Sequence, residues 1–209
     1  MAGGVSVSIK NIDKLLKELD KKKAGTEVAL KRTLSDARKA APGIVADGVR
    51  TKYNIKKAEI TGGKVVRVRT EGTKLEDMCL HYWGRMLTPV HFGMTPKAPP
   101  AGKSYTLKAQ ILKGGKKAIG SYKAKRTQGG QYSAKSPFVL MGTGANSEEG
   151  VSHIPFQRQA PGHRPTEGIH KMTTLSVPQM IDNPEVREII NGKLSEKIKT
   201  RLDYHMSRV

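Results

Sequence analysis

The stretch NPEVREIINGKLSEKIKTRLDYHM, residues 183–206, carries the clearest structural signal in the chain. Its apolar residues recur every four positions and so share one face of an α-helix; they are Val186, Ile190, Leu194, Ile198 and Leu202. Asn183 suits the N-cap position and Pro184 the first helical position. The pattern predicts a long amphipathic helix over 183–208. Its apolar row is a candidate for the protein's core or for a contact between subunits.

Helical spacing also marks the first 60 residues. One apolar face is formed by Ile9, Ile12, Leu15, Leu16 and Leu19. Thr26 is placed to cap a second helix. The predicted buried side of that helix comprises Val28, Ala29, Leu30, Leu34, Ala37, Ala40 and Ala41. Pro42 and Gly43 are expected to end or kink it, and residues 44–60 are expected to add a short third helix.

From residue 64 the apolar period changes to two, which is typical of strands. The alternating segments are 64–70, 76–83 and 104–112, followed by 136–144 and 151–159. The last two segments flank a polar connection and are predicted to form a hairpin.

Helices, then strands, then a helix indicate an α+β fold. We predict a single domain over 1–209. Residues 1–60 form its helical N-terminal part, and residues 64–175 form a mainly antiparallel sheet with a long basic loop at 101–135. The C-terminal helix covers 183–208.

The chain is strongly basic, with 38 Lys and Arg against 18 Asp and Glu and a formal net charge of +20. The excess is concentrated in residues 78–147, which hold 11 basic and no acidic side chains. Ordinary solvated surfaces mix the two signs, so a single-sign stretch of this length indicates a negatively charged partner. The candidates are nucleic acid, an anionic membrane and an acidic protein.

Seven of these cations lie in a segment punctuated by glycines: Lys113, Lys116, Lys117, Lys123, Lys125, Arg126 and Lys135. Three interpretations stay open, namely a solvated loop or mobile hairpin, a surface that contacts phosphates, and a dock for an acidic protein. Tyr122 and Tyr132 lie among the cations and offer rings for base stacking. Phosphate contact would not depend on base sequence and would weaken steeply with salt. The seven cations are therefore candidate nucleic-acid-binding residues.

No group of residues commits to a reaction. His153, His163 and His170 are spaced ten and seven apart, which matches no common zinc pattern. Cys79 lies within a predicted strand, where a small buried residue is expected.

Gly142 and Gly144 follow a predicted strand, but no third glycine falls at the position that a dinucleotide fingerprint needs, and no Walker lysine follows. The acidic pairs Glu76–Asp77 and Glu148–Glu149 are interpreted as solvated turns, and 156–165 as either an anion-binding loop or an exposed turn. The sequence therefore predicts no catalytic residue, no enzyme activity, no metal and no cofactor.

A single cysteine excludes an internal disulfide framework and favours a reducing compartment. No stretch approaches the roughly 18 apolar residues of a membrane helix, and residues 1–10 lack the apolar region of a secretory signal. We therefore expect synthesis in the cytoplasm and no membrane partner.

Several phrases, taken in their order and spacing, resemble the prophage minor tail protein Z family of long-tailed bacteriophages. The phrases are LKRTLSDARKAA (30–41), VRTKYNIKKAEI (49–60), PFVLMGTG (137–144), VSHIPFQRQ (151–159), IHKMTTLSVPQMIDNPEVREII (169–190) and RLDYHM (201–206). The similarity covers roughly residues 26–85 and 137–209.

The resemblance implies a virion structural protein, a tail completion protein at the head-proximal end of the tail, near the head–tail junction. Such proteins are small α+β subunits that assemble into a ring, typically of six. They are needed for a finished tail and for correct placement of the DNA end. The implied partners are further copies of the chain, the tail tube, the tail terminator and the head–tail connector. The end of the double-stranded genome and the tape measure protein are further candidates. The alternative is a general basic nucleic-acid-binding protein, such as a ribosome-associated one.

Overall fold

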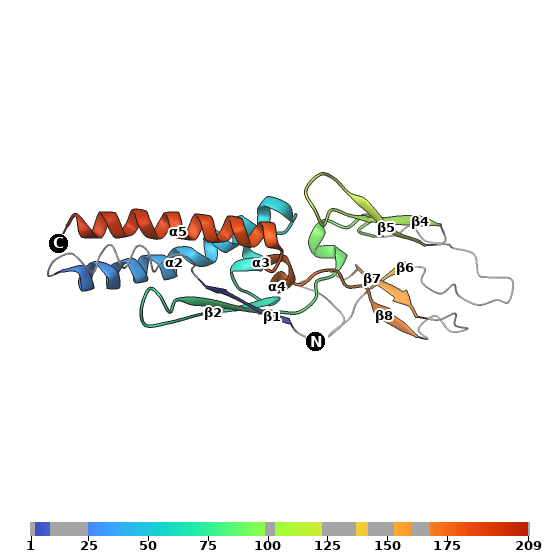
Figure 1. Cartoon of the computed structure of the whole chain (residues 1–209). Coiled ribbons are helices and arrows are strands. Elements are labelled where there is room, and N and C mark those ends of the chain that lie inside the picture. Colours follow the sequence, from blue (N-terminus) through green and yellow to red (C-terminus); the bar gives the residue numbers. More distant parts are fainter. Residues whose placement is uncertain are drawn as a thin grey trace. The chain divides into compact units, whose positions relative to one another are not determined.

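The computed structural model describes residues 3–8, 25–98, 103–122, 137–141, 153–159 and 168–208 (Figure 1). Helices and antiparallel strands both contribute, which confirms the predicted α+β class. The contacts divide the chain into two compact units. Unit 1 comprises Met1–Arg85 and Ser176–Val209, and unit 2 comprises Met86–Leu175. The helix predicted for residues 9–19 lies outside the described residues.

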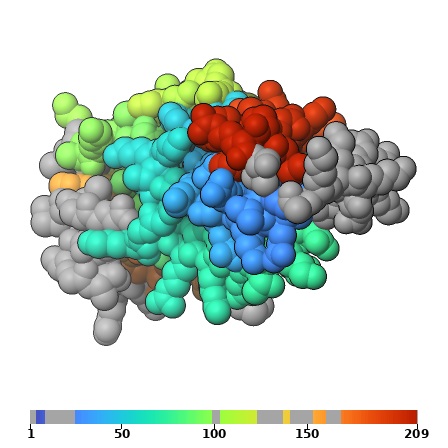
Figure 2. Space-filling model, turned by 90° about the vertical axis from the view of Figure 1, so that its left-hand side faces the viewer, coloured from blue at the N-terminus to red at the C-terminus, as the bar shows by residue number. Residues whose placement is uncertain are grey.

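Unit 1 contains two long helices, α2 (Thr26–Lys52) and α5 (Pro184–Met206), which run antiparallel side by side (Figure 1). Figure 2, seen from the end of the pair that holds the C-terminus, shows α5 in red directly against α2 in blue. The apolar row of α5 is buried throughout: Val186, Ile190, Leu194, Ile198 and Leu202. The buried residues of α2 are mostly small, among them Ala29, Ala37, Ala41, Ala46 and Gly48. Small residues let two helix axes approach closely, so the larger side chains of α5 fill the space between the helices.

The buried stripe of α2 differs from the prediction at one edge. It includes Ala29, Thr33, Ala37 and Ala41, which are spaced by four, and Leu34 beside them. Val28 lies outside this stripe and is 47% exposed, although the sequence placed it on the buried side. The partner elements cover one side of α2, and Val28 lies beyond the edge of that side.

The ends of α2 also differ from the prediction. Gly25, in the left-handed region with φ 109°, is the N-cap, and Thr26 is the first helical residue rather than the cap. Pro42 does not end the helix, which continues to Lys52. The second half of α2 buries Val45 completely, and such tertiary packing outweighs the unfavourable helix propensity of one proline.

The described part of unit 1 also contains two short helices, α3 (Lys57–Thr61) and α4 (Val177–Ile181). A capping box begins α4: the Ser176 hydroxyl accepts from the Gln179 backbone N–H at 3.3 Å, and the Gln179 side chain accepts from the Ser176 N–H at 2.8 Å. Asn183 is the N-cap residue of α5, as predicted, but its side chain forms no capping hydrogen bond.

Polar contacts link α2 to the α5 segment at each end of the helix pair. At one end, Lys52 Nζ donates to Glu185 Oε2 at 2.6 Å and to Asn183 Oδ1 at 3.4 Å. At the other end, His205 Nε2 lies 3.0 Å from Asp36 Oδ2, and Arg201 Nε lies 3.7 Å from the same oxygen. The second cluster makes the helix pair sensitive to the protonation of Asp36.

We expect His205→Ala to raise the pKa of the Asp36 carboxyl. The hydrogen bond from His205 is the largest cause that holds this pKa below its ordinary value, and attraction to Arg201 is a smaller one. A carboxyl with a lowered pKa stabilises the folded state above its unfolded pKa, and this contribution is lost as pH falls through the folded pKa. The pH-dependent difference in stability between wild type and variant should therefore vanish in acid, below both pKa values.

Carboxyl-carbon NMR titration of Asp36 measures the pKa directly. Arg201→Ala is the matched variant, and it should raise the pKa of Asp36 less than His205→Ala does. A larger shift for Arg201→Ala would contradict the assigned order of causes.

The sheet of unit 1 has the order β1-β3-β2, with β1 (Gly3–Ser8) and β2 (Val66–Glu71) both antiparallel to the central β3 (Cys79–Gly84). The predicted alternation through Met78, Leu80 and Tyr82 is confirmed, because all three are fully buried. The strand β1 was not predicted from the sequence. It has only two apolar residues, Val5 and Val7, between glycines and serines.

The described residues of unit 2 form the 3-10 helix η1 (Pro89–Phe92) and two small antiparallel sheets. The first sheet pairs β4 (Tyr105–Ala109) with β5 (Lys117–Tyr122). The second has the order β6-β7-β8, with bounds Pro137–Met141, His153–Arg158 and Ile169–Lys171. The β6–β7 pair confirms the predicted pairing of these two strands.

A small core of Met94, Leu107 and Val139 lies within unit 2. Tyr105 joins its two sheets, since its hydroxyl accepts the Val139 N–H at 3.0 Å. The described strands thus form three sheets, where the sequence predicted one over 64–175. In unit 2 each strand pairs with a neighbour in the sequence, so each small sheet closes locally.

Candidate functional site

The β4–β5 hairpin carries three of the seven cations that the sequence singled out. Its strands pair from Tyr105 opposite Tyr122 to Ala109 opposite Lys117, with a register shift after Leu107. Hydrogen bonding between the Thr106 and Ser121 hydroxyls, 3.0 Å apart, adds a cross-strand contact. Part of the predicted basic loop at 101–135 is therefore a paired hairpin, one of the two forms that the sequence left open.

The connection between β4 and β5 carries Lys113 and Lys116, and Lys117 begins β5. All three lysines are exposed, and none forms an ion pair with another described residue. Gly114 and Gly115 have φ values of 113° and 120°, which other residues rarely adopt, so the glycines fix the turn. The hairpin end is thus a compact group of cations that no carboxylate of the described residues compensates.

The remaining cations of the candidate set, Lys123, Lys125, Arg126 and Lys135, lie outside the described residues. Tyr122 lies inside them, and its ring stacks on Tyr105 with centroids 4.9 Å apart. One face of Tyr122 is therefore already occupied by Tyr105. Tyr132 lies outside the described residues.

The apolar row of α5 was a candidate for core or subunit interface. Its five residues are buried inside unit 1 by the unit's own elements. A second subunit would therefore meet α5 through other residues, on the face that points away from α2.

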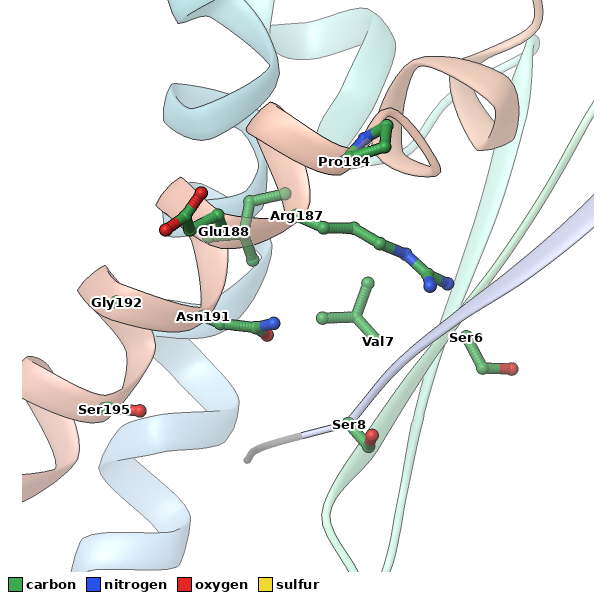
Figure 3. Close-up of a pocket in the computed structure, with 10 residues that line it drawn as sticks. Ser6, Val7, Ser8, Pro184, Arg187, Glu188, Asn191, Gly192 and Ser195 are labelled. Carbon is green, nitrogen blue, oxygen red and sulfur yellow. The ribbon is translucent and has the colours of Figure 1, made fainter. Parts of the chain in front are cut away.

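A cleft of about 660 Å³ lies between β1 and α5 within unit 1 (Figure 3). Figure 3 shows Arg187 and Asn191 extending from α5 toward β1, with Val7 between strand and helix. The lining mixes charges, because Glu188 lies beside Arg187 on α5, and Arg187 Nη2 contacts Asp182 Oδ1 at 3.2 Å. The cleft offers hydrogen bonds but does not gather the acids, bases and nucleophiles of a catalytic site.

The titratable groups named in the sequence do not converge in the described part of the chain. No three His, Cys, Asp or Glu residues there lie close enough to hold a metal ion. Burial raises the pKa of the Cys79 thiol, which disfavours the reactive thiolate. His163 and the pair Glu148–Glu149 fall outside the described residues.

No helix among the described residues is long and apolar enough to cross a membrane. Compared with protein-family models, with curated proteins and with solved structures, the chain matches none.

Proposed function

We propose that this chain is a phage virion structural protein, a minor tail or tail completion protein. It forms part of a ring at the head-proximal end of the tail, near the head–tail junction. There it completes the tail and helps to position the end of the DNA. The support is the resemblance of residues 26–85 and 137–209 to the minor tail protein Z family, together with an α+β fold, the class that the resemblance implies.

The observation that carries the proposal is the exposed cation group at the end of the β4–β5 hairpin, in a 70-residue stretch without an acid. Double-stranded DNA carries about one negative charge per 1.7 Å of its axis. A ring of six chains brings a formal charge of about +120 to that polymer, six times the +20 of one chain. Contact of this kind is independent of base sequence and lets DNA pass.

The alternative function, general nucleic-acid binding, would explain the positive charge equally well. It would place the protein on ribosomes or the nucleoid and not at the head–tail junction. Immunogold electron microscopy of purified phage particles separates the two functions. Label at the head–tail junction is the expected result. Unlabelled particles, with the protein recovered in ribosomal or nucleoid fractions, would overturn the tail assignment.

We expect the triple variant Lys113→Ser, Lys116→Ser and Lys117→Ser to weaken binding to double-stranded DNA while leaving the fold intact. If each lysine contacts one phosphate, the slope of log K against log salt should fall in magnitude by about 2.7, at about 0.9 per phosphate. Fluorescence anisotropy with a labelled duplex at several salt concentrations measures this slope.

The matched control replaces three exposed lysines of unit 1, Lys56, Lys193 and Lys199, by Ser. It removes the same charge from other surfaces and should change the slope far less. Equal slopes for the two triple variants would mean that the hairpin has no special role in DNA contact.

A further inference from the structure

The outer face of the β1-β3-β2 sheet, opposite the buried face of Leu80 and Tyr82, carries a second combination of cations and aromatic rings. Trp83 on β3 is 42% exposed, which is unusual for so large an apolar side chain. Arg67 and Arg69 on β2 are exposed beside it. The sequence analysis treated these residues only as parts of strands.

The register places each arginine opposite a ring. Arg67 pairs with Trp83, and Arg69 pairs with His81. The two rings have centroids 5.6 Å apart and planes inclined by 19°. Residues two apart on a strand lie about 7 Å from each other, so the face repeats a guanidinium and a ring at that interval.

A hollow of about 690 Å³ adjoins these residues, bounded by Gly62, Gly63, Arg67, Arg69 and Trp83. Gly62 has φ 139° and ψ 165°, a backbone conformation that is essentially restricted to glycine. A Cβ on Gly62 would meet no atom within 4 Å, so the space next to the Gly62 backbone is unfilled. The indole is held by β1: a Cβ on Gly4 would lie 3.0 Å from Trp83 Cδ1, so the absence of a side chain there lets the ring edge lie across that strand.

The charge of the hollow is positive on balance. Glu71 Oε1 lies 3.0 Å from Arg69 Nε, and Glu71 Oε2 lies 3.4 Å from His81 Nε2. Glu71 therefore compensates Arg69. Arg67 forms no ion pair with any other described residue, so its guanidinium is available to an anion.

We propose that this hollow binds a nucleotide of a single-stranded nucleic acid. The base stacks on the face of the Trp83 indole that His81 does not occupy, and a phosphate accepts from the Arg67 guanidinium. Aromatic platforms flanked by cations bind single strands in this way, because every base has a stacking face and every link carries a phosphate. A duplex keeps its bases inside and offers Trp83 no partner of this kind. The proposal concerns unit 1 and does not depend on the hairpin or on the tail assignment.

The chain has a single tryptophan, so its intrinsic fluorescence reports on this site alone. The experiment titrates the Lys113→Ser, Lys116→Ser, Lys117→Ser protein, which lacks the three hairpin cations, with a single-stranded oligonucleotide of about ten nucleotides. We expect saturable quenching of Trp83 emission. An abasic oligonucleotide of the same length and a duplex of the same sequence should quench far less at the same salt concentration.

Substitutions locate the binding. Arg67→Ala should weaken the quenching titration about tenfold, whereas Arg50→Ala, an exposed arginine on α2, should not. Trp83→Ala should weaken binding of a labelled oligonucleotide roughly 5- to 150-fold, the loss expected for one stacked base, and Trp83→Phe should restore part of it. Absence of quenching, equal quenching by the abasic strand or the duplex, or no effect of Arg67→Ala would each overturn the proposal. Failure of the head–tail label would leave these results unchanged.

Discussion

Replacing Leu194 by Asp is expected to unfold unit 1. Leu194 is 1% exposed, in the middle of the buried row of α5. Truncating a buried leucine to alanine costs about 2–5 kcal/mol, and a carboxylate in its place adds the cost of removing a charge from water. Since whole domains are stable by only about 5–15 kcal/mol, this one change should remove most of the stability of the helix pair. Far-UV circular dichroism during urea unfolding measures the loss.

Lys193→Asp is the matched control, because it introduces the same side chain one position away, where the helix faces solvent. Its effect on the free energy of unfolding should stay within about 0.5 kcal/mol. A Leu194→Asp protein with the urea midpoint of the wild type would show that the α5 row is not part of the core.

Replacing Gly48 by Ala is expected to destabilise the protein, although alanine is the better helix former. A Cβ on Gly48 would lie 2.5 Å from Ile190 Cγ1, well inside van der Waals contact. Overpacking of this kind typically destabilises a protein by about 1–3 kcal/mol. The better helix propensity of alanine offsets about 1 kcal/mol of that cost. We therefore expect a net loss in the free energy of unfolding, measured by urea denaturation.

Gly192→Ala in α5 is the control for helix propensity, because its added Cβ would meet no atom within 4 Å. It should stabilise the protein by up to about 1 kcal/mol. Combining Gly48→Ala with Ile190→Ala removes Cγ1 and Cδ1 of Ile190, which lie 2.5 and 3.4 Å from the added Cβ, so the two changes should cost less together than the sum of their separate costs. Additive costs would show that Gly48 and Ile190 do not contact each other.

The sequence was sufficient to predict the helices and strands whose buried residues recur at a regular spacing. The spacing of four from Val186 to Leu202 predicts both the helix and its buried face, because one side of a helix packs on a single partner. Period two predicts the buried face of β3 in the same way. The exposed lysines of the hairpin were found by charge alone, since a stretch without acids is visible in composition.

Other features depend on contacts between distant segments. The sequence predicts that Pro42 and Gly43 end or kink the helix, yet α2 continues through both. The strand β1 has too few apolar residues to be recognised, and it forms because β3 offers it a hydrogen-bonding edge. No local sequence pattern predicts that Arg67 lies opposite Trp83. The register of β2 on β3 pairs these two residues, which are separated by 15 others in the chain.

The sequence by itself determined the α+β class, the C-terminal helix with its buried row, and the basic character of the middle. Each depends on residue type and local period, which act along the chain. Only the tertiary structure decided where α2 ends, which glycine the partner helix requires, and which ring lies beside which arginine. Those features arise from packing and pairing between segments far apart in sequence. The stabilising free energy of such a contact exists only when both segments are in place, so neither residue indicates it alone.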